Sequence, residues 1–149
     1  MTIPQTKIFE YFAFRPPYVY VDSVEDAEPG KYAVGVRYFP ADEWFFPIHF
    51  KDDPMVPGNL IAEAMGQVLG LAIQCQEEYR GKKAFLVATD KMRLFNSVRP
   101  GDTLRTKATV TSFRRGLLIG HCESFVGDKK IATSDITLLF EGQPTITPK

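Results

Sequence analysis

One stretch of the chain, from Asn59 to about Arg80, repeats apolar residues with the period of an α-helix. The apolar positions cover most of the helix circumference: Leu60, Ile61, Ala64, Met65, Val68, Leu69, Leu71, Ala72, Ile73 and Cys75. A helix that is apolar nearly all round is usually buried in a core rather than lying on a surface. We therefore predict one long central helix here.

Patterns typical of β-strands surround this helix. One strand is expected at 32–39, after the turn signal at 28–31, and four more at 84–94, 103–113, 117–126 and 130–140. Between positions 40 and 57, four prolines exclude a regular helix and stiffen the loop. The pattern predicts an α+β fold in which an antiparallel sheet wraps around the buried helix.

Length and composition narrow the class of protein. The 149 residues, 44% hydrophobic and 24% charged, suit a single globular domain spanning 1–149. No apolar run approaches the ~20 residues of a membrane helix, and the N-terminus lacks the pattern of a secretory signal. Because Cys75 and Cys122 show no C-x-x-C spacing and the chain has only two His, we expect a cytoplasmic protein without a metal site.

The formal net charge is zero, but the charge is unevenly distributed. Residues 80–115 carry ten Lys and Arg against two acidic residues. This excess suits a negatively charged partner, although strands that display Lys and Arg to solvent would give the same pattern. Nucleic acid is disfavoured as the partner, because a pI of about 6.7 is low for a domain that binds it.

A stripe of polar or small residues interrupts the apolar helix. Glu63, Gln67, Gly70 and Gln74 fall within a narrow arc at about 100° per residue. An acid that complements the helix dipole, with both Gln side chains reaching solvent, would also explain the stripe. Burial would raise the pKa of Glu63 and the helix terminus would lower it, and a carboxyl between those effects suits a general acid.

His49 precedes the proline-rich loop that leads into the helix at Gly58. A lone His is more often structural, and that interpretation is kept for His121. His49 differs because the prolines restrict its loop, and Gly58 permits close backbone approach where free N–H groups can hold an oxyanion. A base, an acid and an oxyanion site within fifteen residues form a plausible set for enolate chemistry.

At these residues the sequence resembles the FabZ-type 3-hydroxyacyl-(acyl carrier protein) dehydratases, enzymes of fatty acid synthesis with the hot-dog fold. The similarity extends over nearly the whole chain. It rests on these residues: His49-Phe50, Pro54, Pro57-Gly58, Leu60, Glu63-Ala64-Met65 and Gln67, with Arg15–Asp22, Glu28–Lys31, Phe45–Pro47, Asp90-Lys91 and Val98–Asp102 around them.

The resemblance implies roles for four of these residues. His49 would remove the α-proton of a (3R)-hydroxyacyl thioester, Glu63 would protonate the departing β-hydroxyl, and the Gly58 N–H would hold the thioester oxygen. Gln67 would contact the Glu63 side chain without touching the substrate. Glu63 favours dehydration without isomerisation, because the related FabA-type enzymes carry Asp here.

The resemblance also implies partners. The substrate would arrive on the phosphopantetheine arm of an acidic acyl carrier protein, with no other cofactor. His and Glu of one site would come from different protomers of a homodimer, and such dimers commonly assemble into hexamers as trimers of dimers.

Several positions depart from the family pattern: Ile48, Lys51-Asp52-Asp53, Ala62 and Leu94–Ser97, where the family has an Arg-rich stretch. These departures suggest an unusual substrate or partner. Two other functions remain open, a hot-dog acyl thioesterase and a non-catalytic acyl-binding or partner subunit. The length, saturation and branching of the acyl group, and the pathway it belongs to, also remain open.

Overall fold

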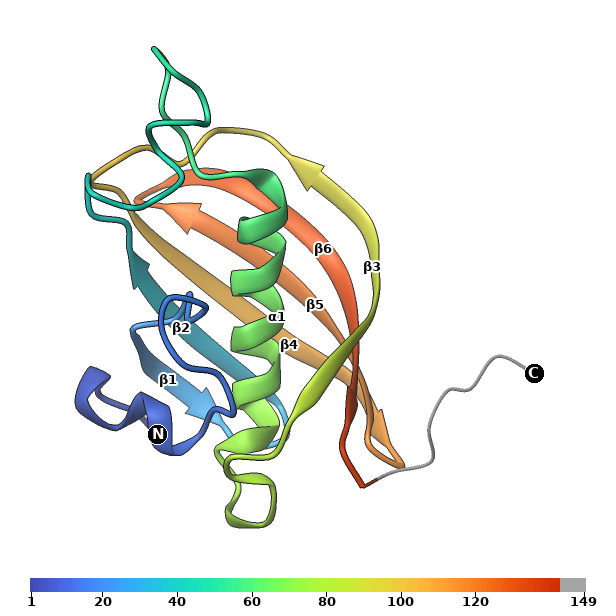
Figure 1. The fold of residues 1–149 in the computed structure, drawn as a ribbon. Helices are drawn as coiled ribbons and strands as arrows, with labels where there is room; N and C mark the ends of the chain where they lie inside the picture. Colours follow the sequence, from blue (N-terminus) through green and yellow to red (C-terminus); the bar gives the residue numbers. More distant parts are fainter. Residues whose placement is uncertain (143–149) are drawn as a thin grey trace.

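The computed structural model describes residues 1–142, which form one six-stranded antiparallel sheet and one long α-helix (Figure 1). Residues 143–149 of the predicted domain lie outside the described residues. The elements in chain order are η1 (Gln5–Glu10), β1 (Ser23–Glu28), β2 (Tyr32–Tyr38), α1 (Gly58–Gln74), η2 (Glu77–Tyr79), β3 (Ala84–Leu94), β4 (Thr103–Arg114), β5 (Leu117–Val126) and β6 (Lys129–Phe140), where η marks a 3-10 helix.

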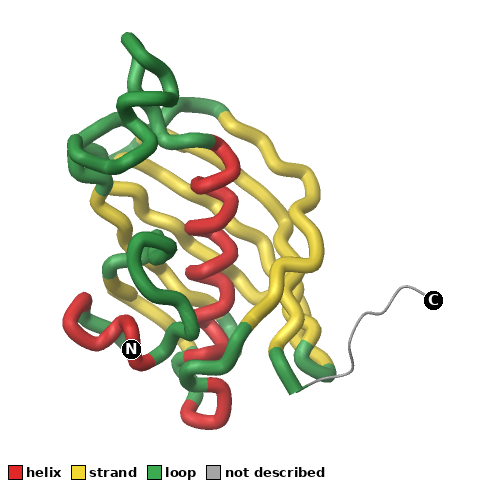
Figure 2. Tube along the Cα trace, viewed as in Figure 1, coloured by secondary structure: helices red, strands yellow, loops and turns green. Residues whose placement is uncertain are grey.

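The strands lie in the order β1-β2-β4-β5-β6-β3. Strands β4, β5 and β6 follow one another as a meander, whereas β3 pairs with the last strand and forms one edge of the sheet. The β1–β2 turn needs a positive φ, which Gly30 provides at 80°. The curved sheet wraps around α1 (Figures 1 and 2).

Helix α1 is buried from Ala64 to its end at Gln74. Two glycines in the sheet allow it to lie close. A Cβ at Gly35 of β2 would come within 2.4 Å of Val68, and one at Gly120 of β5 within 2.3 Å of Leu69. Because real Cβ atoms do not approach so closely, both positions need glycine for this packing.

The predicted α+β arrangement, with an antiparallel sheet around one buried helix, is confirmed. The helix is shorter than predicted: it ends at Gln74 because the apolar pattern stops at Cys75, and polar residues then form η2. Strand β1 is not predicted by the pattern, because only Val24 and Ala27 of its six residues are buried. Among the described residues, no helix combines the length and apolar character needed to cross a membrane.

Candidate active site

The loop between β2 and α1 carries His49 and is anchored by buried aromatic side chains. Phe45 packs edge-on against Phe39 and Phe46, and all three are at most 3% exposed. At the far end of the loop, the Val56 N–H donates to the Val98 carbonyl (2.8 Å). The loop therefore has two fixed ends, and His49 lies between them.

The His49 ring is oriented by the backbone of its own loop. Its Nδ1 lies 3.2 Å from the Met55 carbonyl oxygen, and the ring stacks on Phe50 with 4.2 Å between centroids. A carbonyl only accepts hydrogen bonds, so in the neutral ring this contact assigns the proton to Nδ1. The Nε2 lone pair is then available to accept a proton.

His49 lines a cavity of about 420 Å³ together with Gly58, Phe50 and residues of the 94–97 segment. Gly58 is the first residue of α1, and its N–H has no acceptor among the described residues. The Leu94 side chain lies over it, since a Cβ at position 58 would be 2.6 Å from Leu94 Cδ1. An imidazole and a free backbone N–H thus share one cavity.

Glu63 lies further along α1, half-buried in the wall of a second cavity. Its Oε1 accepts a hydrogen bond from Gln67 Nε2 (3.1 Å), and the Tyr18 phenol faces the same carboxyl group. Burial raises the pKa of Glu63 above its usual value, and the interactions with Gln67 and Tyr18 oppose this increase. A carboxyl whose pKa is raised keeps its proton to higher pH, as a general acid requires.

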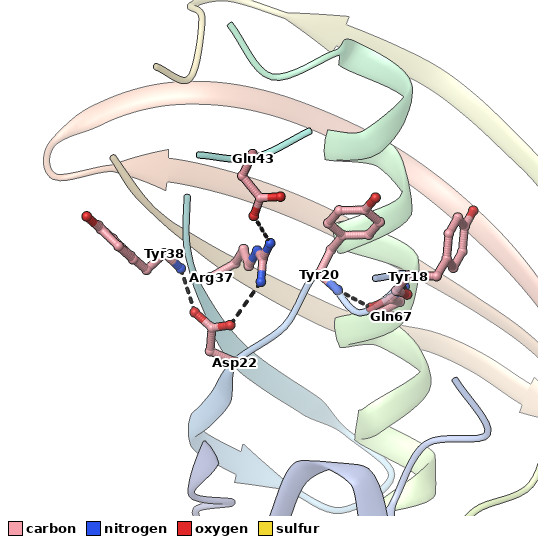
Figure 3. Close-up of polar contacts among 7 residues, drawn as sticks. All are labelled: Tyr18, Tyr20, Asp22, Arg37, Tyr38, Glu43 and Gln67. Carbon is pink, nitrogen blue, oxygen red and sulfur yellow. Dashed lines mark hydrogen bonds and ion pairs between the residues drawn. The ribbon is translucent and has the colours of Figure 1, made fainter. Parts of the chain in front are cut away.

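Gln67 also ties α1 to the segment before β1 (Figure 3). Its Oε1 accepts from the Tyr20 N–H (2.8 Å), and its Nε2 donates to the Tyr18 carbonyl (3.0 Å). Gln67 is 3% exposed and Gln74 is 2% exposed, so neither reaches solvent. The alternative in which both Gln side chains are solvated is therefore wrong.

A second polar cluster joins the same segment to the loop of His49 (Figure 3). Arg37 of β2 forms ion pairs with Asp22 (3.2 Å) and Glu43, and Asp22 also accepts from the Tyr38 N–H (2.7 Å). The Arg37 guanidinium lies over the Tyr20 ring, 5.5 Å from its centroid. Arg37 thus connects the segment that supports Glu63 with the start of the loop that carries His49.

Within one chain His49 and Glu63 line different cavities. His49 shares its cavity with Gly58, whereas Glu63 shares the other with Gln67. The sequence predicts these four residues, His49, Gly58, Glu63 and Gln67, as site residues, but it does not predict the contacts of Tyr18 and Arg37. No local signal identifies those two, because the contact of Tyr18 with Glu63 and that of Arg37 with Asp22 join segments that are separate in the sequence.

Among the described residues, no group of three or more His, Cys, Asp or Glu side chains is arranged to hold a metal ion.

The β3 edge of the sheet exposes apolar side chains. Among the described residues, β3 pairs with β6 alone. Three successive residues of β3 are exposed: Phe85 (54%), Leu86 (56%) and Val87 (42%). Phe85 and Leu86 also line the cavity that holds Glu63, so this apolar edge lies beside that cavity. Such an edge is typical of an interface.

Comparison with known proteins gives consistent matches. The sequence model of the FabA-like domain matches residues 15–135. The protein named 3-hydroxyacyl-(acyl-carrier-protein) dehydratase FabZ from Thermoanaerobacter sp. (strain X514) is 39% identical over 125 residues, covering 84% of this chain and 88% of that one. FabZ of Bacillus cereus (strain AH820) is 38% identical over 131 residues, covering 88% and 91%.

Solved structures share the fold. The dehydratase heterocomplex ApeI:P from Xenorhabdus doucetiae aligns with a TM-score of 0.76 at 15% identity, over 92% of this chain and 90% of that chain. A hypothetical thioesterase with coenzyme A from Streptococcus pneumoniae TIGR4 aligns with a TM-score of 0.59 at 11% identity, over 82% and 87%. The expected hot-dog fold is confirmed by these similarities.

Proposed function

Because the chain belongs to the FabA-like family, we propose that it dehydrates (3R)-3-hydroxyacyl thioesters on acyl carrier protein to trans-2-enoyl thioesters in fatty acid or related lipid biosynthesis. The observation that carries this proposal is Glu63, a half-buried carboxyl whose pKa is raised by burial, in the wall of a mostly apolar cavity. A carboxyl in that environment can deliver a proton to a leaving hydroxyl.

The proposed reaction needs no cofactor other than the phosphopantetheine arm that carries the substrate. His49 Nε2 takes the α-proton, and negative charge gathers on the thioester oxygen, which accepts from the Gly58 N–H. Glu63 then donates its proton to the β-hydroxyl as the C–O bond breaks, so that water leaves and the double bond forms. Gln67 holds the Glu63 carboxyl in place.

The proposed active unit is a homodimer with shared sites. His49 and Glu63 line separate cavities in one chain, so a second copy that brings its His49 to this Glu63 would complete a site. The exposed edge of β3 suits pairing with the same strand of a second copy, which would continue the sheet. We further propose a hexamer, a trimer of such dimers, as the resemblance implies.

The proposed partner is an acidic acyl carrier protein, which would act with this enzyme in the cytoplasm. The basic excess of residues 80–115 offers a complementary surface. Strands β3 and β4 carry most of this region.

The test is turnover of a carrier-bound 3-hydroxyacyl substrate, followed through formation of the conjugated enoyl thioester. We expect His49→Ala and Glu63→Gln each to lose about 10²–10⁴-fold in kcat. His121→Ala is the matched control, because His121 is exposed on β5 and lines neither cavity. Its Nδ1 lies 2.7 Å from the Asp135 carboxylate. Wild-type turnover in both site variants would overturn the assigned roles.

The same assay separates the other two functions. Release of free thiol without an enoyl product would identify a thioesterase. Carrier-protein binding with no turnover at any chain length would identify a non-catalytic subunit.

A further inference from the structure

Two cavities meet beside the C-terminal end of α1. The cavity beside Glu63 measures about 230 Å³ and extends along the helix as far as Gln74. A second cavity, of about 260 Å³, adjoins it, because some residues line both. The boundary between the two cavities is formed by these shared residues: Phe14, Gln74, Ala84 and Phe85.

Of the shared residues, Phe14 has the large side chain that separates the cavities from within one chain. Ala84 carries only a methyl group, and Gln74 is held by the hydrogen bond from its Nε2 to the Lys82 carbonyl (2.9 Å). Phe85 lies on the exposed edge of β3, where a second copy is proposed to bind. The Phe14 ring is therefore the apolar group whose removal would join the two cavities.

The position of Phe14 along the helix follows from the segment that carries it. The Tyr11 carbonyl accepts a hydrogen bond from the Gly81 N–H (3.1 Å), beyond the end of α1. Further along the segment, the Tyr20 N–H donates to Gln67 Oε1 (2.8 Å), near the middle of the helix (Figure 3). The segment therefore runs antiparallel to α1, and Phe14 lies between these two contacts.

The boundary corresponds to a length of acyl chain. Gly70 lines the first cavity but not the second, whereas Gln74 lines both, so the boundary lies between seven and eleven residues after Glu63. At about 1.5 Å per residue, this is roughly 10 to 16 Å along the helix axis. Because an extended chain advances roughly 1.2 Å per bond, the boundary lies roughly nine to fourteen bonds beyond the carbon that loses water.

The Phe14 ring is held in place by its neighbours. Phe12, which is 2% exposed, packs edge-on against it with 5.7 Å between ring centroids, and the Tyr18 ring packs against it at 5.9 Å. Arg15 Nη1 donates to the carbonyls of Phe12 (3.3 Å) and Phe14 (2.7 Å), which restrains the backbone on both sides. A ligand that passes from the first cavity into the second must displace the ring from these contacts.

On the basis of the proposed dehydratase function, we propose that Phe14 limits the length of the acyl chain that the cavity beside Glu63 accepts. A chain that ends before the boundary fits within the first cavity, whereas the last methylene groups of a longer chain meet the Phe14 ring and are not buried. Burying one more methylene group favours binding by about fourfold. Affinity therefore rises with chain length up to the boundary and not beyond it.

The test compares 3-hydroxydecanoyl and 3-hydroxyoctadecanoyl substrates on the carrier protein, because the first chain ends before the boundary and the second reaches past it. We expect the wild-type protein to prefer the shorter substrate by about tenfold or more in kcat/KM. Phe14→Ala should raise kcat/KM for the longer substrate by about tenfold and leave the shorter one nearly unchanged. A wild-type protein without this preference, or a Phe14→Ala variant that keeps it, would overturn the proposal.

Phe9→Ala is the matched control for this substitution. Phe9 is another aromatic residue of the N-terminal segment, it is 40% exposed, and it lines neither cavity. We expect Phe9→Ala to keep the wild-type preference. A gain for the longer substrate in Phe9→Ala as large as that in Phe14→Ala would refute a specific role of Phe14.

A substitution in the opposite direction separates this role from a loss of folded protein. Phe14→Trp enlarges the ring and should move the limit to shorter chains, so that kcat/KM falls for 3-hydroxydecanoyl and stays the same for 3-hydroxybutanoyl carrier protein. A loss of folded protein would instead lower both values equally. If Phe14→Trp, like Phe14→Ala, favoured the longer chains, the ring would not set the limit.

Binding separates this proposal from the function on which it rests. Calorimetry with saturated decanoyl and octadecanoyl carrier protein needs no turnover, because neither chain has a 3-hydroxyl to lose. A preference for the decanoyl chain that disappears in Phe14→Ala supports the role of Phe14 even if the protein dehydrates nothing. Dehydration together with equal affinity for the two chains leaves the proposed function intact and refutes the limit.

Discussion

The regions around Glu63 and His49 are built in opposite ways. Glu63 projects from a buried helix, and Gln67 links its carboxyl to a segment more than forty residues away in the sequence. His49 lies in a loop whose tip is exposed, with Ile48 at 70% and Phe50 at 51%, and a carbonyl six residues further along the same loop orients its ring.

The difference matches what the proposed acid, Glu63, and the proposed base, His49, each require. For the acid, burial sets the pKa, so Glu63 needs a rigid, partly dry wall. For the base, the choice of tautomer matters, and one local carbonyl is sufficient for that. Arg37 joins the two regions, since it pairs with Asp22 on one side and with Glu43 on the other.

The largest effect is expected from mixing two inactive variants. Homodimers of His49→Ala and of Glu63→Gln each lack one group in both sites. After dissociation and reassociation, half of the dimers carry one variant of each kind and hold one intact site, so about a quarter of wild-type activity should return. Activity of the remixed proteins, with unmixed proteins taken through the same procedure as the control, measures this. No recovery in verified heterodimers would show that the two groups do not meet across the interface.

Removing Gln67 should affect stability far more than removing His49. Gln67→Leu leaves the Tyr20 N–H and the Tyr18 carbonyl without their partner, which should reduce the free energy of unfolding by about 2–4 kcal/mol. His49→Ala removes one contact in a partly exposed loop and should cost less than about 1 kcal/mol. Urea unfolding of both variants provides the comparison. Equal losses of unfolding free energy in the two variants would contradict the proposed difference between the region of Glu63 and the loop of His49.

The pKa of Glu63 makes stability depend on pH. Burial raises the pKa in the folded state, so folding favours the protonated carboxyl, and this favourable term is lost as pH rises through the range between the unfolded and folded values. Glu63→Gln is neutral at every pH and should match the wild type in acid while exceeding its stability at neutral pH. Melting temperatures across that range test this. A variant that is less stable at neutral pH would contradict it.

The smallest effect is expected at Tyr18. Its interaction with Glu63 lowers the pKa of that carboxyl, so Tyr18→Phe should raise this pKa further. The alkaline limb of the kcat profile should then move to higher pH, with only a few-fold change near neutrality. Tyr20→Phe is the control, because the Tyr20 contact with Gln67 uses the backbone N–H and survives the substitution. An unchanged profile in Tyr18→Phe would exclude this influence.

Much of the fold follows from local sequence patterns. The apolar period predicts the central helix, and strand patterns predict β2 to β6 nearly to their observed ends. Strand β1 escapes prediction because its acidic residues lack a clear apolar alternation, and its pairing with β2 stabilises it instead. The predicted end of the helix, at about Arg80, is also wrong, because helix-compatible residues continue past Gln74, where the chain leaves the core and α1 ends.

The candidate site divides in the same way. His49, Gly58, Glu63 and Gln67 lie within one continuous stretch, and their spacing can be read directly. The contacts of Tyr18 with Glu63, of Tyr20 with Gln67 and of Arg37 with Asp22 arise only when separate segments pack together, so no local spacing encodes them. The buried Gln74 Oε1, which has no hydrogen-bond partner among the described residues, also becomes visible only in three dimensions.

The glycines beneath α1 have an effect beyond their own contacts. Gly35 and Gly120 determine how deeply the helix sinks into the sheet, yet neither lines the cavity beside Glu63. A single methyl group at either position would lift the helix and change the width of the cavity beside Glu63. The range of ligands that this cavity accepts can therefore evolve through positions that never meet a ligand, and a search for such variants should begin underneath the helix rather than in the cavity.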